Sequence, residues 1–111
     1  MNFDSKIEVR VGWRSQKLPI FVRMLDKDTR WSWNNGLPTL ITTMLQMNLN
    51  GYMFVLPDMI GGNGYVGNSF EETVLPPKEM FIRWLQANTF MPSLQYSFVP
   101  WDFNDPEVII E

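Results

Sequence analysis

The chain has 111 residues, of which 45% are hydrophobic and 19% are charged, and its formal net charge at pH 7 is -3. The absence of cysteine and histidine excludes disulfides, Cys/His zinc sites and any histidine-containing catalytic triad built from this chain alone. The sequence pI of about 4.8 disfavours nucleic acid as a partner, because phosphate binding needs a positive surface.

The first elements predicted along the chain are two strands and a helix. In residues 7–14 apolar side chains occupy every second position, as in a half-buried strand, and Arg10 lies on the opposite face. Residues 19–26 are a second apolar run that ends at Asp26. The apolar residues of 37–48 follow helical spacing, which predicts a helix of about three turns.

The second half of the chain repeats this alternation. Residues 52–56 are apolar on both faces, as expected of a parallel strand that is covered on two sides. After a loop, Pro76-Pro77 opens a helix that Pro92 ends, and residues 93–99 are predicted to form a further strand. The order strand, strand, helix, strand, helix, strand predicts an α/β fold.

Four parallel strands with two outer helices are about half of a (β/α)8 TIM barrel, which takes roughly 250 residues to close. We therefore interpret residues 1–111 as one piece of an incomplete barrel. An open doubly wound sheet is the alternative. The barrel is favoured because Asp26 and Asp58 follow strand ends and Arg10 faces inward, and barrel enzymes keep their active sites at the carboxyl ends of the strands.

A glycine-rich loop follows the third predicted strand. Its glycines Gly62, Gly64 and Gly67 match the spacing of the dinucleotide-binding pattern GxGxxG. That pattern requires a helix to begin at its third glycine, whereas the next predicted helix begins only at Pro76. No cofactor and no metal ion is therefore expected, and the glycines are explained by a tight loop.

Several landmarks occur in a fixed order. Arg10 lies sixteen residues before Asp26, and Trp31 lies five residues after it. Pro-Asp-Met-Ile-Gly-Gly follows at residues 57–62, and residues 77–92 contain a Glu, Arg-Trp, Gln and Phe-Met-Pro series. In this order and spacing, nearly the whole chain resembles the later, C-terminal part of the catalytic barrel of glycoside hydrolase family 31, the retaining α-glycosidases. It is most similar to the branch of myogenesis-regulating glycosidases.

The resemblance implies roles for individual residues. Asp26 would be the general acid that protonates the leaving glycosidic oxygen and then the base that activates water. Arg10 and Asp58 would hold sugar hydroxyls where the bond is broken. Such an acid has to be protonated near neutral pH, which calls for burial or a neighbouring carboxylate.

Three further substrate-binding candidates follow from the same resemblance. Arg23 stands where an active-site tryptophan is usual, Trp31 matches a following tryptophan, and Ser97 stands where a substrate-binding histidine is common. These differences imply a substrate other than an ordinary α-glucoside, and α-galactosides are the first candidates.

The nucleophile of the family is missing. Its Trp-x-Asp-Met-Asn-Glu segment does not occur in the chain, whereas a retaining glycosidase needs two carboxyl groups. We therefore expect part of an O-glycosyl hydrolase that supplies the acid/base and sugar-binding groups for a carbohydrate substrate and is inactive alone. No membrane anchor is visible in the sequence, and the resemblance is compatible with a secreted or membrane-anchored parent.

Two alternatives stay open. The chain could belong to a catalytically inactive, carbohydrate-binding or scaffold relative of the same barrel, or to an unrelated α/β module. In the latter case Asp26, flanked by Lys27 and Asp28, would be an ordinary solvated turn residue that caps the next element.

Overall fold

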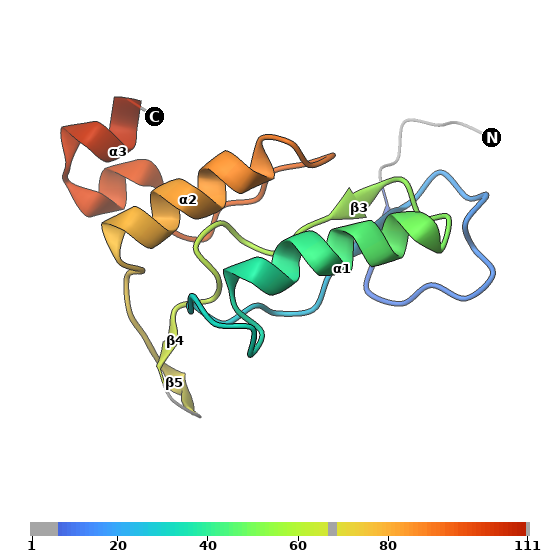
Figure 1. The fold of residues 1–111 in the computed structure, drawn as a ribbon, viewed down its shortest axis with the longest axis horizontal. Coiled ribbons are helices and arrows are strands. Elements are labelled where there is room, and N and C mark those ends of the chain that lie inside the picture. Colours follow the sequence, from blue (N-terminus) through green and yellow to red (C-terminus); the bar gives the residue numbers. More distant parts are fainter. Residues whose placement is uncertain (1–6, 67–68, 111) are drawn as a thin grey trace.

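The computed structural model describes residues 7–66 and 69–110 and has a small α/β architecture (Figure 1). A parallel three-stranded sheet has the order β1-β2-β3 and is made by Glu8–Val9, Phe21–Arg23 and Val55–Leu56. A separate antiparallel pair consists of β4 (Tyr65–Val66) and β5 (Ser69–Thr73). The helical elements are α1 (Leu37–Leu49), α2 (Lys78–Asn88), the 3-10 turn η1 (Pro100–Phe103) and α3 (Pro106–Ile110).

The two long helices lie where the sequence predicts them. Helix α1 begins beside Pro38, whose missing N–H is harmless in a first turn, and it ends before Gly51, which adopts a φ of 93°. The buried face of α2 includes Phe81 and Trp84, both with no exposed surface. These rings, with the buried side chains of α1 and β3, form one hydrophobic core.

The strands are shorter than predicted. The strand expected over residues 7–14 is confined to β1, because the chain turns away after it: Arg14 has a φ of 54°, a left-handed conformation that an extended strand does not contain. Gly12 lies so close to Tyr52 that a Cβ atom at this position would be 2.7 Å from the tyrosine hydroxyl. The alternation of apolar and polar residues therefore predicted that a strand forms here, but not where it ends.

The strand predicted over residues 93–99 is wrong. This segment is irregular in the structure, and one backbone hydrogen bond joins it to the loop after β3, from the amide of Ile60 to the carbonyl of Gln95 at 2.9 Å. A strand needs a series of such bonds to a neighbouring strand, and a single bond to a loop does not provide one. The described sheet thus has three parallel strands rather than four, and the loop predicted after β3 contains the β4–β5 pair instead.

None of the helices in the described part of the chain is long and apolar enough to span a bilayer.

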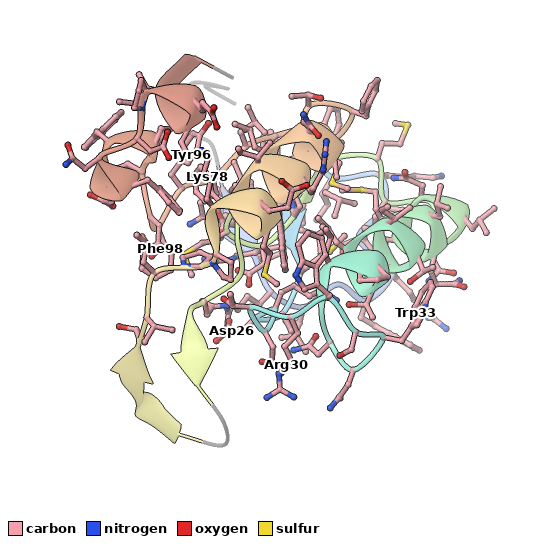
Figure 2. All side chains as sticks on the ribbon, turned by 60° about the vertical axis from the view of Figure 1, so that its left-hand side comes forward. Asp26, Arg30, Trp33, Lys78, Tyr96 and Phe98 are labelled. Carbon is pink, nitrogen blue, oxygen red and sulfur yellow. The ribbon has the colours of Figure 1, made fainter. Side chains whose placement is uncertain are left out.

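Lys78 joins the start of α2 to α3 (Figure 2). Its ammonium donates to Asp105 at 2.8 Å and also pairs with Glu107. The hydrogen bond to Asp105, followed by that to Glu107, raises the pKa of Lys78, and the hydrogen bond from Lys78 lowers the pKa of Asp105. The carboxyl of Asp105 therefore stabilises the fold above its unfolded pKa of 3.8, and the ammonium does so below its unfolded pKa of 10.5.

We expect this contact to make the docking of α3 depend on pH. The melting temperature of the protein minus that of a Lys78→Met variant should be greatest, and constant, between about pH 5 and pH 9. It should shrink as the pH falls through the lowered pKa of Asp105, and again as the pH rises through the raised pKa of Lys78. Lys17→Met, which removes an exposed lysine, serves as the control. A difference that does not vary with pH would contradict the prediction.

Candidate functional site

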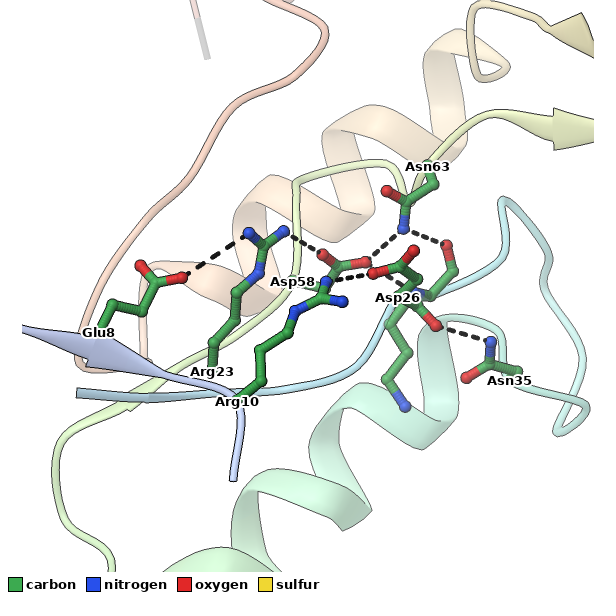
Figure 3. Close-up of polar contacts among 8 residues, drawn as sticks. Glu8, Arg10, Arg23, Asp26, Asn35, Asp58 and Asn63 are labelled. Carbon is green, nitrogen blue, oxygen red and sulfur yellow. Dashed lines mark hydrogen bonds and ion pairs between the residues drawn. The ribbon is translucent and has the colours of Figure 1, made fainter. Parts of the chain in front are cut away.

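Asp26 and Asp58 lie at the same edge of the sheet. Asp26 follows the end of β2 and Asp58 follows the end of β3. These strands are parallel neighbours with Arg23 opposite Leu56, so both loops leave the sheet from its carboxyl edge. Figure 3 shows the two carboxylates side by side with two guanidinium groups between them and the strands.

Arg10 and Asp26 form an ion pair at this edge. A guanidinium nitrogen of Arg10, just beyond the end of β1, donates to one carboxylate oxygen of Asp26. This hydrogen bond is the main reason why the pKa of Arg10 is raised above its usual value. The side chains are 47% and 37% exposed, respectively. A solvent-borne ligand can therefore reach both groups.

Asp58 has a different environment, because its side chain has no exposed surface. Its Oδ1 atom accepts a hydrogen bond from Arg23 Nη2 at 2.9 Å. Its Oδ2 atom accepts from the amide of Lys27 at 2.5 Å and from Asn63 Nδ2 at 2.6 Å. Both oxygens are thus engaged by protein donors, so Asp58 holds the loops after β2 and β3 together. Direct binding of sugar hydroxyls by Asp58 remains a prediction.

Arg23 occupies the space between two carboxylates (Figure 3). Its Nη2 atom binds Asp58, and its Nη1 atom lies 3.7 Å from Oε1 of Glu8 in β1. The side chain is only 15% exposed. A buried guanidinium needs compensating charge, and here β1 and the loop after β3 supply it from two sides.

Three residues that the sequence did not single out hold this edge together. Asn35 donates from its side chain to the carbonyl of Asp26 at 2.9 Å, and it adopts a φ of 59°, which asparagine tolerates better than most residues. Asn63 donates from its backbone and side chain to the carbonyl of Lys27 at 2.9 and 3.0 Å. Lys27 is only 6% exposed, although it lies between two acids in the sequence.

The glycine-rich loop explains why Asn63 can reach Lys27. Gly62 has a φ of 76°, and a Cβ atom there would lie 3.0 Å from the carbonyl oxygen of Lys27. At Gly64 a Cβ atom would lie 2.6 Å from the carbonyl oxygen of Val74. The sequence predicts a tight loop at these glycines, and the structure shows in addition that they let other segments of the chain approach closely. The third glycine of the pattern, Gly67, lies outside the described residues. In the sequence, the position of Asn63 between Gly62 and Gly64 was the one sign that its side chain lies where two segments meet.

A cavity of about 390 Å³ lies between α1 and the first two strands. Trp31 is 50% exposed and Ser97 is exposed, and neither belongs to the cavity lining. The structure brings four of the six predicted site residues (Arg10, Arg23, Asp26 and Asp58) into one cluster, and of these four Arg10 and Arg23 line the cavity whereas Asp26 and Asp58 do not. The lining of the cavity includes Arg10, Arg23, Lys27, Asn35, Thr43 and Tyr52.

Comparison with known sequences gives two relatives, and no family model matches the chain. The chain is 41% identical over 109 residues to the myogenesis-regulating glycosidase of Mus musculus. The aligned region covers 96% of this chain and 15% of that protein. It is 38% identical over 101 residues to the SITS-binding protein of Tetronarce californica. Here the aligned region covers 91% of this chain and 14% of that protein. The chain thus spans about a seventh of the length of the curated relatives it matches.

Proposed function

The chain belongs to the family of the myogenesis-regulating glycosidase, to one part of which it corresponds, and on that premise we propose that it is part of a retaining α-glycosidase barrel. The strand order, with the acids at one carboxyl edge, supports this proposal. The observation that carries it is the Arg10–Asp26 pair, because it joins a cation to an accessible acid where barrel enzymes perform catalysis.

In the proposed reaction Asp26 donates its proton to the leaving glycosidic oxygen and later takes a proton from the attacking water. A carboxyl group that donates a proton has to be protonated first, and a protonated carboxyl forms no ion pair. We therefore propose that Arg10 turns from Asp26 to a sugar hydroxyl when substrate binds. The exposure of both side chains leaves room for this exchange.

The second carboxyl group of a retaining mechanism lies about 5 to 5.5 Å from the first. Asp58 is a poor candidate for it, because both of its oxygens accept hydrogen bonds from protein donors and its side chain is buried. We propose that the nucleophile lies in another part of the parent protein. Arg23, Trp31 and Ser97 remain proposed substrate-binding positions, and α-galactosides are the substrates to test first.

The test compares the 111-residue chain with a full-length protein that carries it. Aryl α-galactosides and aryl α-glucosides serve as substrates, because their chromogenic leaving groups report turnover directly. We expect turnover by the full-length protein and none by the chain alone. Hydrolysis by the isolated chain would contradict a nucleophile elsewhere. A full-length protein that binds galactose without hydrolysing either substrate would favour the inactive carbohydrate-binding relative.

A further inference from the structure

Lys27 is a buried cation directly beside the proposed acid. Its ammonium donates to the hydroxyl of Thr39 at 2.9 Å and to that of Thr43 at 3.5 Å, one helical turn further along α1. In the described parts of the chain no carboxylate forms an ion pair with this ammonium. Burial lowers the pKa of Lys27, and the charges of Asp58 and Asp28 oppose this shift only in part.

A buried ammonium held by neutral hydroxyls is an unfavourable way to fill space, because an apolar side chain of the same length avoids the desolvation. Groups that are costly to bury are often retained for function rather than for stability. The contacts of Lys27 indicate what that function is.

The backbone of Lys27 joins the loop after β2 to the loop after β3. Its amide donates to Asp58, and its carbonyl accepts two hydrogen bonds from Asn63. The preceding carbonyl, that of Asp26, accepts from Asn35. The peptide unit between Asp26 and Lys27 is therefore held on both sides.

The side chain of Lys27 adds the connection to α1. The hydroxyl of Thr39 accepts from the ammonium and donates to the carbonyl of Gly36 at 2.7 Å, the residue at the start of α1. The ammonium thereby connects the loop that carries Asp26 to the first two turns of a helix in the core. A proton donor has to be held in a fixed position, since a displacement of its carboxyl group by about 1 Å can lower the rate 100-fold.

We propose that Lys27 is a positioning residue, whose ammonium anchors the Asp26 loop to Thr39 and Thr43 of α1 so that the carboxyl of Asp26 meets the glycosidic oxygen. The proposal rests on the proposed function, because it assigns Lys27 to the proton transfer by Asp26. In this role Lys27 acts through Asp26 and not through a contact of its own with the reacting atoms.

The experiment uses Lys27→Met in the full-length protein, with Lys17→Met as the matched control, and two α-glycosides that differ in leaving group. An alkyl glycoside needs protonation of its leaving oxygen, whereas a nitrophenyl glycoside needs much less. We expect Lys27→Met to lower kcat on the alkyl substrate about tenfold to 100-fold, with a smaller loss on the nitrophenyl substrate. KM should change less than about threefold. The melting temperature should stay the same or rise, because an unfavourably buried charge is removed.

A double variant, Thr39→Val with Thr43→Val, tests the same anchor from the helix side and keeps the test usable if Lys27→Met fails to fold. It should show the same dependence on the leaving group, and the triple variant should lose little more, because all three residues act as one unit. Equal losses on both substrates, or full activity of Lys27→Met, would overturn the proposal.

Asp26→Asn separates failure of this proposal from failure of the proposed function. If Asp26→Asn shows the leaving-group dependence and Lys27→Met does not, the positioning role is wrong and the glycosidase assignment stands. If Asp26→Asn lacks it as well, the proposed function fails and the positioning role fails with it.

Discussion

Replacement of Asp26 by asparagine in the full-length protein is expected to lower kcat on alkyl α-glycosides by about 100- to 10,000-fold, the range that general acid catalysis supplies. Asparagine keeps the shape of the side chain, and its carbonyl oxygen can still accept from Arg10, but its amide has no proton acidic enough to transfer to the leaving oxygen. Sugar binding should therefore persist. Turnover of a nitrophenyl glycoside should fall less, because its leaving group departs without protonation. Steady-state kinetics with both substrates, and binding of the free sugar by calorimetry, measure these effects.

Asp28→Asn is the matched control for this prediction. Asp28 lies in the same loop and is also partly buried, but its carboxylate pairs with Arg30 at 3.5 Å rather than with Arg10. Its replacement should leave both rates close to those of the unaltered protein. Unchanged turnover by Asp26→Asn would remove Asp26 from the mechanism, and comparable losses in the two variants would indicate damage to the loop instead of lost proton transfer.

Asp58→Ala is expected to destabilise the protein by about 3–5 kcal/mol, the usual effect of removing one partner of a buried ion pair. The change leaves the guanidinium of Arg23 with only the more distant Glu8, and it deprives the amide of Lys27 and the side chain of Asn63 of their acceptor. Unsatisfied buried donors add to the loss. Urea unfolding of the full-length protein, followed by tryptophan fluorescence, measures the change in free energy.

Glu79→Ala provides the comparison, because it breaks an exposed i, i+4 pair with Arg83 at 2.8 Å and should cost less than about 1 kcal/mol. Combining Arg23→Met with Asp58→Ala should destabilise less than the sum of the single changes, since the second change removes a charge already left unpaired. An Asp58→Ala variant that keeps full stability but binds sugar more weakly would show that Asp58 is chiefly a sugar ligand.

The sequence was most informative about helices in which apolar residues recur at helical spacing over several turns. Helix α1 begins at Leu37 as predicted and ends one residue later than residue 48, because its apolar spacing, Pro38 and Gly51 all indicate the same bounds. Strands β1, β2 and β3 all lie within predicted segments, whereas the strand predicted over residues 93–99 does not form. The strand ends were not predicted. Beyond β1 the chain turns away at Arg14, and Gly12 packs against Tyr52, forty residues away in the sequence.

The same distinction holds for the candidate site. The family resemblance singled out Arg10 and Asp26 as candidates, and the structure pairs their side chains. The parallel pairing of β2 and β3 brings Asp26 and Asp58 to one edge of the sheet as predicted. Nothing local indicated that Asp58 would be fully buried or that Lys27, between two acids in sequence, would turn inward to α1.

The sequence by itself determined the two long helices and the order of the three parallel strands along the chain, because these follow from side-chain periodicity. Only the tertiary structure decided which acid is accessible and which is enclosed. That difference arises from donors such as Arg23 and Asn63, which come from separate segments and meet only after the sheet and its loops have assembled.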